Sequence, residues 1–188
     1  MFIQTEETPN PESLKFIPGI EVSPEKSVNF KSEQDCYISL LAKNLFDIKY
    51  VTSVFFGKDF ITVSKQKDKS WEVIKPEILL TITEHFSANL PVFNSQDAKA
   101  EKDEPEGDEL TKQIKEIIEH KIRPALAQDG GDVVFHSFKN GIVKLALHGA
   151  CSGCPRANIT LKHGIENMLK HYVPEVISVE SSNNTCCS

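Results

Sequence analysis

The chain has no continuous apolar run of the length that a membrane-spanning helix needs, which is about 18 residues or more. It also has no surplus of basic residues, because 21 Lys and Arg stand against 27 Asp and Glu for a net charge of −6. Broad binding to nucleic acid or to anionic membranes depends on such a surplus, so both are excluded. The first residues lack the features of a secretory signal and of a transit peptide, so we expect neither.

Cysteine is scarce, and its placement is uneven. The five cysteines are Cys36, Cys151, Cys154, Cys186 and Cys187. An odd, irregular set differs from the disulfide framework of a small secreted protein. We therefore expect a reducing intracellular setting, where a CxxC pair is usually metal-binding or redox-active.

Most of the negative charge lies in one segment. Residues 95–109 hold seven acidic and two basic residues, which leaves the rest of the chain nearly neutral. The stretch 91–108 shows neither helical nor strand periodicity, and it cannot bury enough apolar surface to offset the entropy of ordering. We interpret it as a flexible acidic linker between a domain at 1–90 and a domain at 109–182, followed by a polar tail at 183–188.

The N-terminal half mixes strand and helix patterns. We expect strands at 2–5 and 13–17, a helix at 36–46, a hairpin of strands 50–56 and 60–63, and a helix at 71–86. No acid pair, Ser–His pair or phosphate loop stands out in this half. Cys36 is alone there, and a buried structural thiol is the favoured interpretation.

The C-terminal half has the order α-β-β-α-β. Apolar spacing from Leu110 to Ile122 predicts a helix, and Asp129-Gly-Gly131 ends that region. Asn140-Gly141 lies between two apolar runs and predicts a hairpin. A long helix follows, with Leu161, Ile165, Met168, Leu169 and Tyr172 on one face, and then a strand at 176–179. The predicted fold class is α+β, with two small domains.

The segment GACSGCP at 149–155 carries the most chemistry. Two small residues separate Cys151 from Cys154, so a short turn can aim both sulfurs at one metal centre. Pro155 favours the first position of a helix. A helix N-terminus and the charge of Arg156 would lower the pKa of a nearby thiol, and the thiolate is the form that binds metal.

Two cysteines make an incomplete site. Structural zinc and ordinary iron–sulfur clusters take four ligands, and this domain holds no second CxxC. The simplest completion is a second chain that contributes its own pair across a two-fold axis. A cluster held between chains on short loops would be relatively exposed and easy to pass on.

Other interpretations stay open at this point. Cys151 and Cys154 could form a redox dithiol, a zinc-stabilised interaction module or an inert pair. The small domain, and a proline after rather than between the cysteines, count against a thioredoxin-like site. His148 could add a ligand, although an exposed strand-end histidine is favoured.

Two further groups have simpler explanations than chemistry. Asp129 and Asp132 fit a turn beside the two glycines. Cys186 and Cys187 lie in a polar tail and fit disordered thiols, with auxiliary metal capture as the alternative.

Both halves resemble known domains. Three segments resemble the NifU C-terminal domain: AQDGGDV at 127–133, GACSGCP at 149–155 and TLKHGIE at 160–166. Four segments resemble the N-terminal domain of Nfu-type scaffold proteins: MFIQTE at 1–6, TPNP at 8–11, SLKF at 13–16 and PG at 18–19. The match covers both halves in that order, which makes it more specific than the CxxC alone.

The resemblance implies an iron–sulfur cluster carrier and not an enzyme. It implies a [4Fe–4S] cluster bridging a homodimer through Cys151 and Cys154, and transfer to apo iron–sulfur proteins by thiolate exchange. An upstream assembly scaffold would supply the cluster, and the N-terminal domain would dock partners. Arg156 and Ala157 replace the small hydroxyl residues common in the family, which could alter cluster stability. We expect a bacterial cytoplasm, with the mitochondrial matrix as the alternative.

Overall fold

The computed structural model describes residues 2–94, 109–152 and 155–181. Residues 95–108 of the predicted linker, Cys154 and the tail with Cys186 and Cys187 lie outside the described residues. The chain forms two domains of mixed helix and sheet, which confirms the predicted α+β class. The exact boundaries of domains, linker and tail stay predictions.

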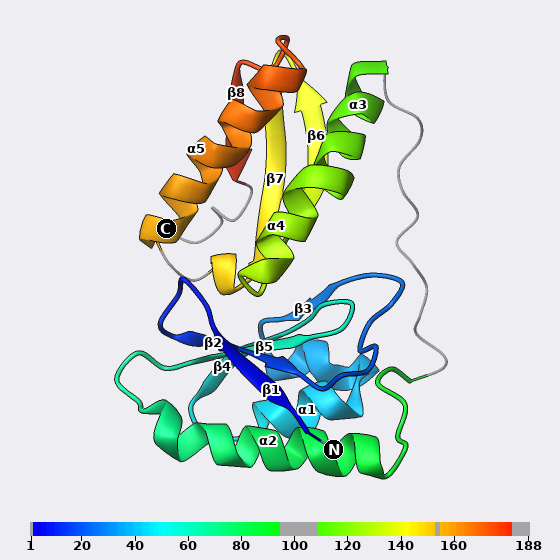
Figure 1. Cartoon of the computed structure of the whole chain (residues 1–188), viewed down its shortest axis with the longest axis vertical. Coiled ribbons are helices and arrows are strands. Elements are labelled where there is room, and N and C mark those ends of the chain that lie inside the picture. Colours follow the sequence, from blue (N-terminus) through cyan, green and yellow to red (C-terminus); the bar gives the residue numbers. More distant parts are fainter. Residues whose placement is uncertain (1, 95–108, 153–154, 182–188) are drawn as a thin grey trace.

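The N-terminal domain is a five-stranded antiparallel sheet with helices on one side (Figure 1). Its elements are β1 (Gln4–Glu7), β2 (Ser13–Ile17), β3 (Val28–Phe30), the 3₁₀ helix η1 (Glu33–Ile38), α1 (Leu40–Phe46), β4 (Val51–Phe56), β5 (Ile61–Lys65) and α2 (Trp71–Ser87). The strand order is β1-β2-β5-β4-β3. In α2, Ile74, Ile78 and Ile82 repeat every four residues and are buried against the sheet.

Two details of this domain differ from the sequence prediction. The helix expected at 36–46 is interrupted at Ser39, whose extended backbone and side chain cap α1 by accepting the Ala42 amide. Strand β3 is only three residues long, and no alternating pattern marked it in the sequence. Both arise because local hydrogen bonding and sheet pairing overrode the apolar periodicity.

The C-terminal domain packs two helical segments on one face of a three-stranded sheet. Its elements are α3 (Glu109–Ile117), the π-helical turn η2 (Ile118–Ile122), α4 (Arg123–Gln128), β6 (Gly131–Lys139), β7 (Ile142–Gly149), the 3₁₀ turn η3 (Ala150–Ser152), α5 (Pro155–Tyr172) and β8 (Ser178–Ser181). Strands β6 and β7 are antiparallel, and β8 joins β7 in parallel. This is the predicted α-β-β-α-β order.

The hairpin turn and one face of α5 test the sequence patterns further. Asn140 and Gly141 both have positive φ, at 52° and 76°, as the predicted two-residue hairpin requires. Of the five apolar residues that the sequence places on one face of α5, Ile165 and Leu169 are buried in the core and Leu161 packs against it. Met168 and Tyr172, on the same face, are 37% and 48% exposed.

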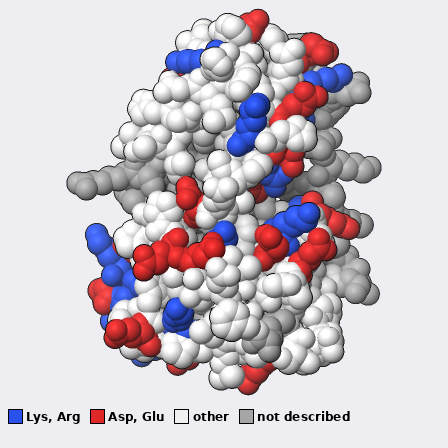
Figure 2. Space-filling view, in the orientation of Figure 1, with Lys and Arg blue, Asp and Glu red and all other residues white. Residues whose placement is uncertain are grey.

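The two domains lie against each other, with the C-terminal domain on the side of the N-terminal sheet opposite α1 and α2 (Figure 1). Their apolar cores are separate clusters. Acidic and basic side chains are interspersed on the face seen in Figure 2. No helix among the described residues is long and apolar enough to cross a membrane.

Candidate functional site

Cys151 lies in η3, directly after the end of β7 and next to the two glycines that open β6. Gly149 pairs with Gly131 across the sheet, and a Cβ added at Gly131 would lie 2.2 Å from the Cys151 sulfur. The glycine is therefore required because the sulfur occupies the space of its missing side chain. Helix α5 begins at Pro155, as the sequence predicted. Cys154 is outside the described residues, so the pair itself stays a prediction.

The Cys151 thiol faces inward in this conformation. Its residue is 3% exposed and belongs to the apolar core of the C-terminal domain. Burial raises the pKa of the thiol to about 12, and Asp129 and Asp132 add to the rise. The lowered thiol pKa expected from the helix N-terminus concerns Cys154, which lies outside the described residues, so that expectation stays a prediction.

Backbone hydrogen bonds fix the residue before Cys151. The Ala150 amide donates to the Gly130 carbonyl at 3.1 Å, and the Thr62 hydroxyl donates to the same carbonyl at 2.8 Å. The Ala150 carbonyl accepts from Asn10 Nδ2 at 3.3 Å. Since Thr62 and Asn10 belong to the N-terminal domain, both domains position the cysteine loop.

Asp132 anchors a second polar group beside the loop. Arg123 donates to both of its carboxylate oxygens at 2.8 Å, and the Val133 amide donates at 2.8 Å. Ser27 of the N-terminal domain also donates to Asp132. The hydrogen bond to Asp132 is the main reason that the pKa of Arg123 is raised. The sequence suggested only a turn role for Asp132, because nothing in the chain order marks Arg123 or Ser27 as its partners.

His148 is not the exposed strand-end histidine that the sequence favoured. It is partly buried, and its Nδ1 has no hydrogen-bond partner among the described residues. Burial lowers the pKa of His148, and the nearby Lys31 and His136 lower it further. Asp132 has the opposite effect and raises it. The N-terminal domain supplies Lys31, and sequence alone gave no sign that this domain covers the strand end.

The remaining candidates do not join the site. Cys36 is 2% exposed within the N-terminal core, which confirms the predicted buried thiol, and burial raises its pKa to about 11. Among the described residues, no group of three or more His, Cys, Asp or Glu could hold a metal ion.

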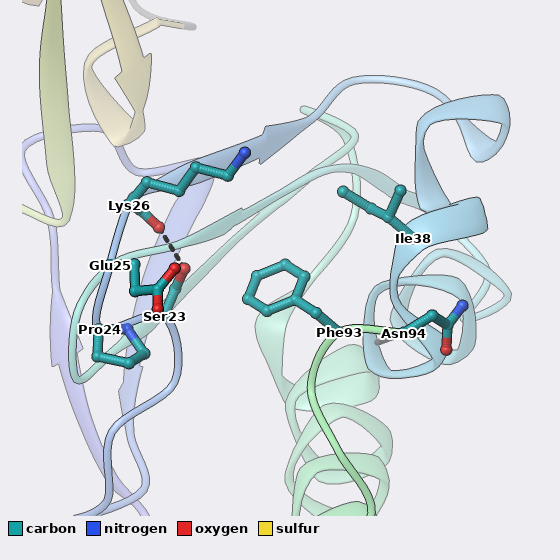
Figure 3. A pocket seen from close by; sticks show the side chains of 7 residues that line it. All are labelled: Ser23, Pro24, Glu25, Lys26, Ile38, Phe93 and Asn94. Carbon is teal, nitrogen blue, oxygen red and sulfur yellow. Dashed lines mark hydrogen bonds between the residues drawn. The ribbon is translucent and has the colours of Figure 1, made fainter. Parts of the chain in front are cut away.

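Two hollows accompany these features. A cavity of about 250 Å³ lies in the N-terminal domain between the loop 23–26 and the side chains of Ile38 and Phe93 (Figure 3). It contains no cysteine or histidine and is not part of the Cys151 site. A second cleft of about 330 Å³ lies between the domains, where Phe55 and Phe60 face Arg123, Gly131 and Asp132.

Two family models match the chain. The model described as "Scaffold protein Nfu/NifU N terminal" matches residues 3–89, and the "NifU-like domain" model matches residues 114–180. The human protein named "NFU1 iron-sulfur cluster scaffold homolog, mitochondrial" is 47% identical over 181 residues, which cover 96% of this chain and 71% of that protein. The chain belongs to the Nfu family of iron–sulfur cluster scaffold proteins. The resemblance stated from sequence segments is thereby confirmed.

Other Nfu relatives extend beyond this chain. A Drosophila willistoni protein of the same name is 48% identical over 185 residues, covering 96% of the chain and 63% of that protein. The chain thus spans somewhat less than two thirds of the length of this relative. The solution NMR structure of a NifU-like protein from Saccharomyces cerevisiae is 30% identical and covers 51% of this Nfu chain and 87% of that chain, with a TM-score of 0.47.

Proposed function

We propose that this Nfu-family chain holds a [4Fe–4S] cluster as cargo between two copies of itself and delivers it to apo iron–sulfur proteins. Family membership over both domains carries this proposal, because relatives matching nearly the whole chain are named as iron–sulfur cluster scaffolds. Cys151 and Cys154 would supply two thiolates from each chain. They are the only cysteines between residues 109 and 182, so a second chain is the simplest source of the other two ligands.

Delivery is a ligand exchange with no turnover of a substrate, so we class the chain as a carrier and not as an enzyme. Thiolates of the recipient would replace those of the carrier one at a time. An upstream assembly scaffold would supply the cluster.

We infer placement in the mitochondrial matrix, the alternative in the sequence analysis. The names of the relatives from human and from Drosophila willistoni both include "mitochondrial". The bacterial cytoplasm, the first expectation, stays a prediction without support from these relatives.

Anaerobic reconstitution with iron and sulfide tests the function directly. We expect about four iron and four sulfide per dimer, together with a shift from monomer to dimer in analytical ultracentrifugation. Cys151→Ser should abolish cluster retention and dimer formation. Cys36→Ser is the matched control, because that thiol is buried in the other domain and should leave loading intact.

Different results would favour the other interpretations. A colourless protein with tightly bound zinc indicates an interaction module. Reduction of insulin without any cluster indicates a dithiol oxidoreductase. Cluster retention in Cys151→Ser would contradict the ligand assignment and direct attention to Cys186 and Cys187.

A further inference from the structure

A row of side chains crosses the N-terminal sheet on the face that α1 and α2 leave uncovered. Strand pairing places these residues opposite one another, in the order Glu6, Lys15, Thr62, Phe55 and Asn29 from β1 to β3. Directly paired residues share a face of a sheet, and the neighbours of Thr62, which are Ile61 and Val63, belong to the domain core. The row therefore points away from that core, and the C-terminal domain lies on this side of the sheet (Figure 1).

Burial shows that this row is covered. Thr62 is 0% exposed, Phe55 is 2% exposed and Lys15 is 8% exposed. A sheet face that α1 and α2 do not cover would leave a central threonine and lysine in water, so the cover comes from elsewhere in the chain. A Cβ added at Gly149 would lie 3.0 Å from the Phe55 ring, and one added at Gly130 would lie 2.9 Å from Thr62 Oγ1. The glycine turns around Cys151 are the cover.

The polar contacts of the row recognise backbone. Thr62 donates to the Gly130 carbonyl, and Lys15 Nζ donates to the Gln128 carbonyl at 3.3 Å. Asn10, in the turn before β2, donates to the carbonyl of the Ala150–Cys151 peptide. These three donors bind backbone carbonyls of a tight turn and of the neighbouring η3. The backbone can approach the sheet this closely because the turn contains glycines.

The contact is close but not fully packed. It consists largely of hydrogen bonds, and the cleft of about 330 Å³ remains beside it between the domains. The net contribution of each such hydrogen bond is small, so a few of them make a contact that can open and close.

Opening matters because of the direction of the Cys151 sulfur. The sulfur lies against Gly131 inside the C-terminal domain, whereas a ligand shared with a second chain must face outward. Turning it outward requires the η3 backbone to move. Ala150 is held at both its amide and its carbonyl, and the latter bond comes from the N-terminal domain.

We propose that the Lys15–Thr62–Phe55 face of the N-terminal sheet is a docking surface for the cysteine-bearing loop of its own chain, and that this contact must release before the loop can take a cluster. The first part stands on the interdomain contacts alone. The second part rests on the proposed cluster-carrier function.

Thiol access in the full chain tests the docking. Thr62→Val and Ser27→Ala each remove one interdomain hydroxyl while keeping the side-chain volume similar, and they are combined in one variant. We expect alkylation of Cys151, resolved by peptide mass spectrometry under native conditions, to become about tenfold faster. Thr52→Val is the control, since it makes the same chemical change at an exposed position of β4.

Cys36 provides an internal standard in the same molecule. It is buried in the N-terminal core, so its alkylation reports on unfolding of that domain. A rise for Cys151 with no change for Cys36 supports docking. If the alkylation rates of both cysteines rise together, the single variant Ser27→Ala decides, because Ser27 lies outside the core. In that variant, a faster alkylation of Cys151 alone supports docking. Any other result overturns it.

Protein concentration separates docking within one chain from docking between copies. Alkylation rates of Cys151 that are the same at protein concentrations of about 5 and about 50 μM support the intramolecular contact. Protection of Cys151 that increases with concentration overturns it in favour of a second copy. Equal Cys151 rates in wild type, the double variant and the control also overturn it.

Loading kinetics separate the two parts of the proposal. In anaerobic reconstitution, the double variant should load iron and sulfide about tenfold faster than wild type and the control. Loading at the same rate despite faster alkylation overturns the release step. If wild type takes up no cluster at all while the alkylation difference persists, the proposed function fails and the docking surface stands.

Discussion

Cys36 and Cys151 are both buried thiols with raised pKa values, yet the backbone around them differs. Cys36 donates to the Ser32 carbonyl at 3.4 Å inside one domain, beside Asp35 and Glu33. Cys151 lies at the end of a strand, against a glycine, beneath a contact between domains. Burial alone is the same for both, so the neighbouring backbone distinguishes them.

His85 is a second buried group, and it predicts a pH dependence of stability. It is 2% exposed at the end of α2, and neither ring nitrogen has a hydrogen-bond partner in good geometry among the described residues. Burial lowers its pKa below the ordinary value of 6.5, and the backbone of Leu90 and Pro91 offsets this only in part. Folded His85 therefore stays neutral where the unfolded chain is already protonated.

The free energy of unfolding should be highest above pH 6.5 and decrease as the pH falls through that value, because the unfolded state then binds more protons. Urea titrations of apo protein between pH 8 and pH 5 measure this. His85→Leu should reduce the slope over that interval, and the lowered pKa of His148 accounts for part of the slope that remains. His120→Leu, at an exposed position, should leave the slope unchanged, and an unchanged slope in His85→Leu would contradict the prediction.

At the residue scale, Cys151 could be identified from the sequence, but its burial could not. CxxC spacing and a following proline were sufficient to find the loop. The Cys151 sulfur lies against Gly131, and the Ala150 carbonyl beside it accepts from Asn10, which is about 140 positions away in the chain. No local pattern contains such contacts, so the burial of the thiol could not be predicted.

The close approach of β6 to η3 predicts a steric effect at Gly131. This glycine has no positive φ, so alanine is excluded there by contact and not by backbone conformation. Gly131→Ala should lower the free energy of unfolding by about 1–3 kcal/mol, because the new methyl group overlaps the Cys151 sulfur. Chemical denaturation of the apo chain measures the loss.

A second background tests the cause of that loss. In Cys151→Ala the sulfur is gone, so Gly131→Ala should cost less than half as much. Gly164→Ala is the control, since nothing lies within 4 Å of its added Cβ and alanine favours the helix. Equal losses at Gly131 in both backgrounds would show that the sulfur is not the obstacle.

Elements were predicted well where periodicity or turn chemistry is local. Strand β2, helix α2 and the Asn140-Gly141 hairpin follow directly from such patterns. Strand β3 and the break at Ser39 do not, because one depends on pairing with β4 and the other on a cap hydrogen bond. The exposed Met168 and Tyr172 show the same limit, since a helix stripe can be wider than the sheet it covers.

At the scale of the whole molecule, Arg123 lies where α4, β6 and the loop that contains Ser27 meet. We expect its substitution to lower the stability in a way that is coupled to Asp132. Its guanidinium binds Asp132 at two points, and the Asp132 side chain is only 8% exposed. Arg123→Met leaves that carboxylate buried without its cation. We expect the free energy of unfolding to fall by about 2 kcal/mol, less than for a fully buried pair because Arg123 is 32% exposed.

A double-mutant cycle with Asp132→Asn checks the coupling in urea titrations. The loss in the double variant should be smaller than the sum of the two single losses. Glu119→Gln removes the exposed partner of Arg123 and should cost less than about 1 kcal/mol. Strict additivity of the Arg123 and Asp132 losses would contradict the coupling.

The arrangement of the two domains could not be predicted from the sequence. The acidic stretch at 91–108 suggested only independent units. The described contacts instead join Thr62, Lys15 and Asn10 to the glycine turns, through residues that look like ordinary strand and turn positions in the sequence.

The parallel pairing of β8 with β7 has a consequence for synthesis of the chain. Domains generally fold as units, the N-terminal one first as the polypeptide emerges. Strand β8 is the last element among the described residues, and its Val179 completes the C-terminal core beside Val143. The cysteine loop, which precedes α5, therefore leaves the ribosome well before its own sheet can close. During that interval the finished N-terminal sheet is the first folded surface it meets.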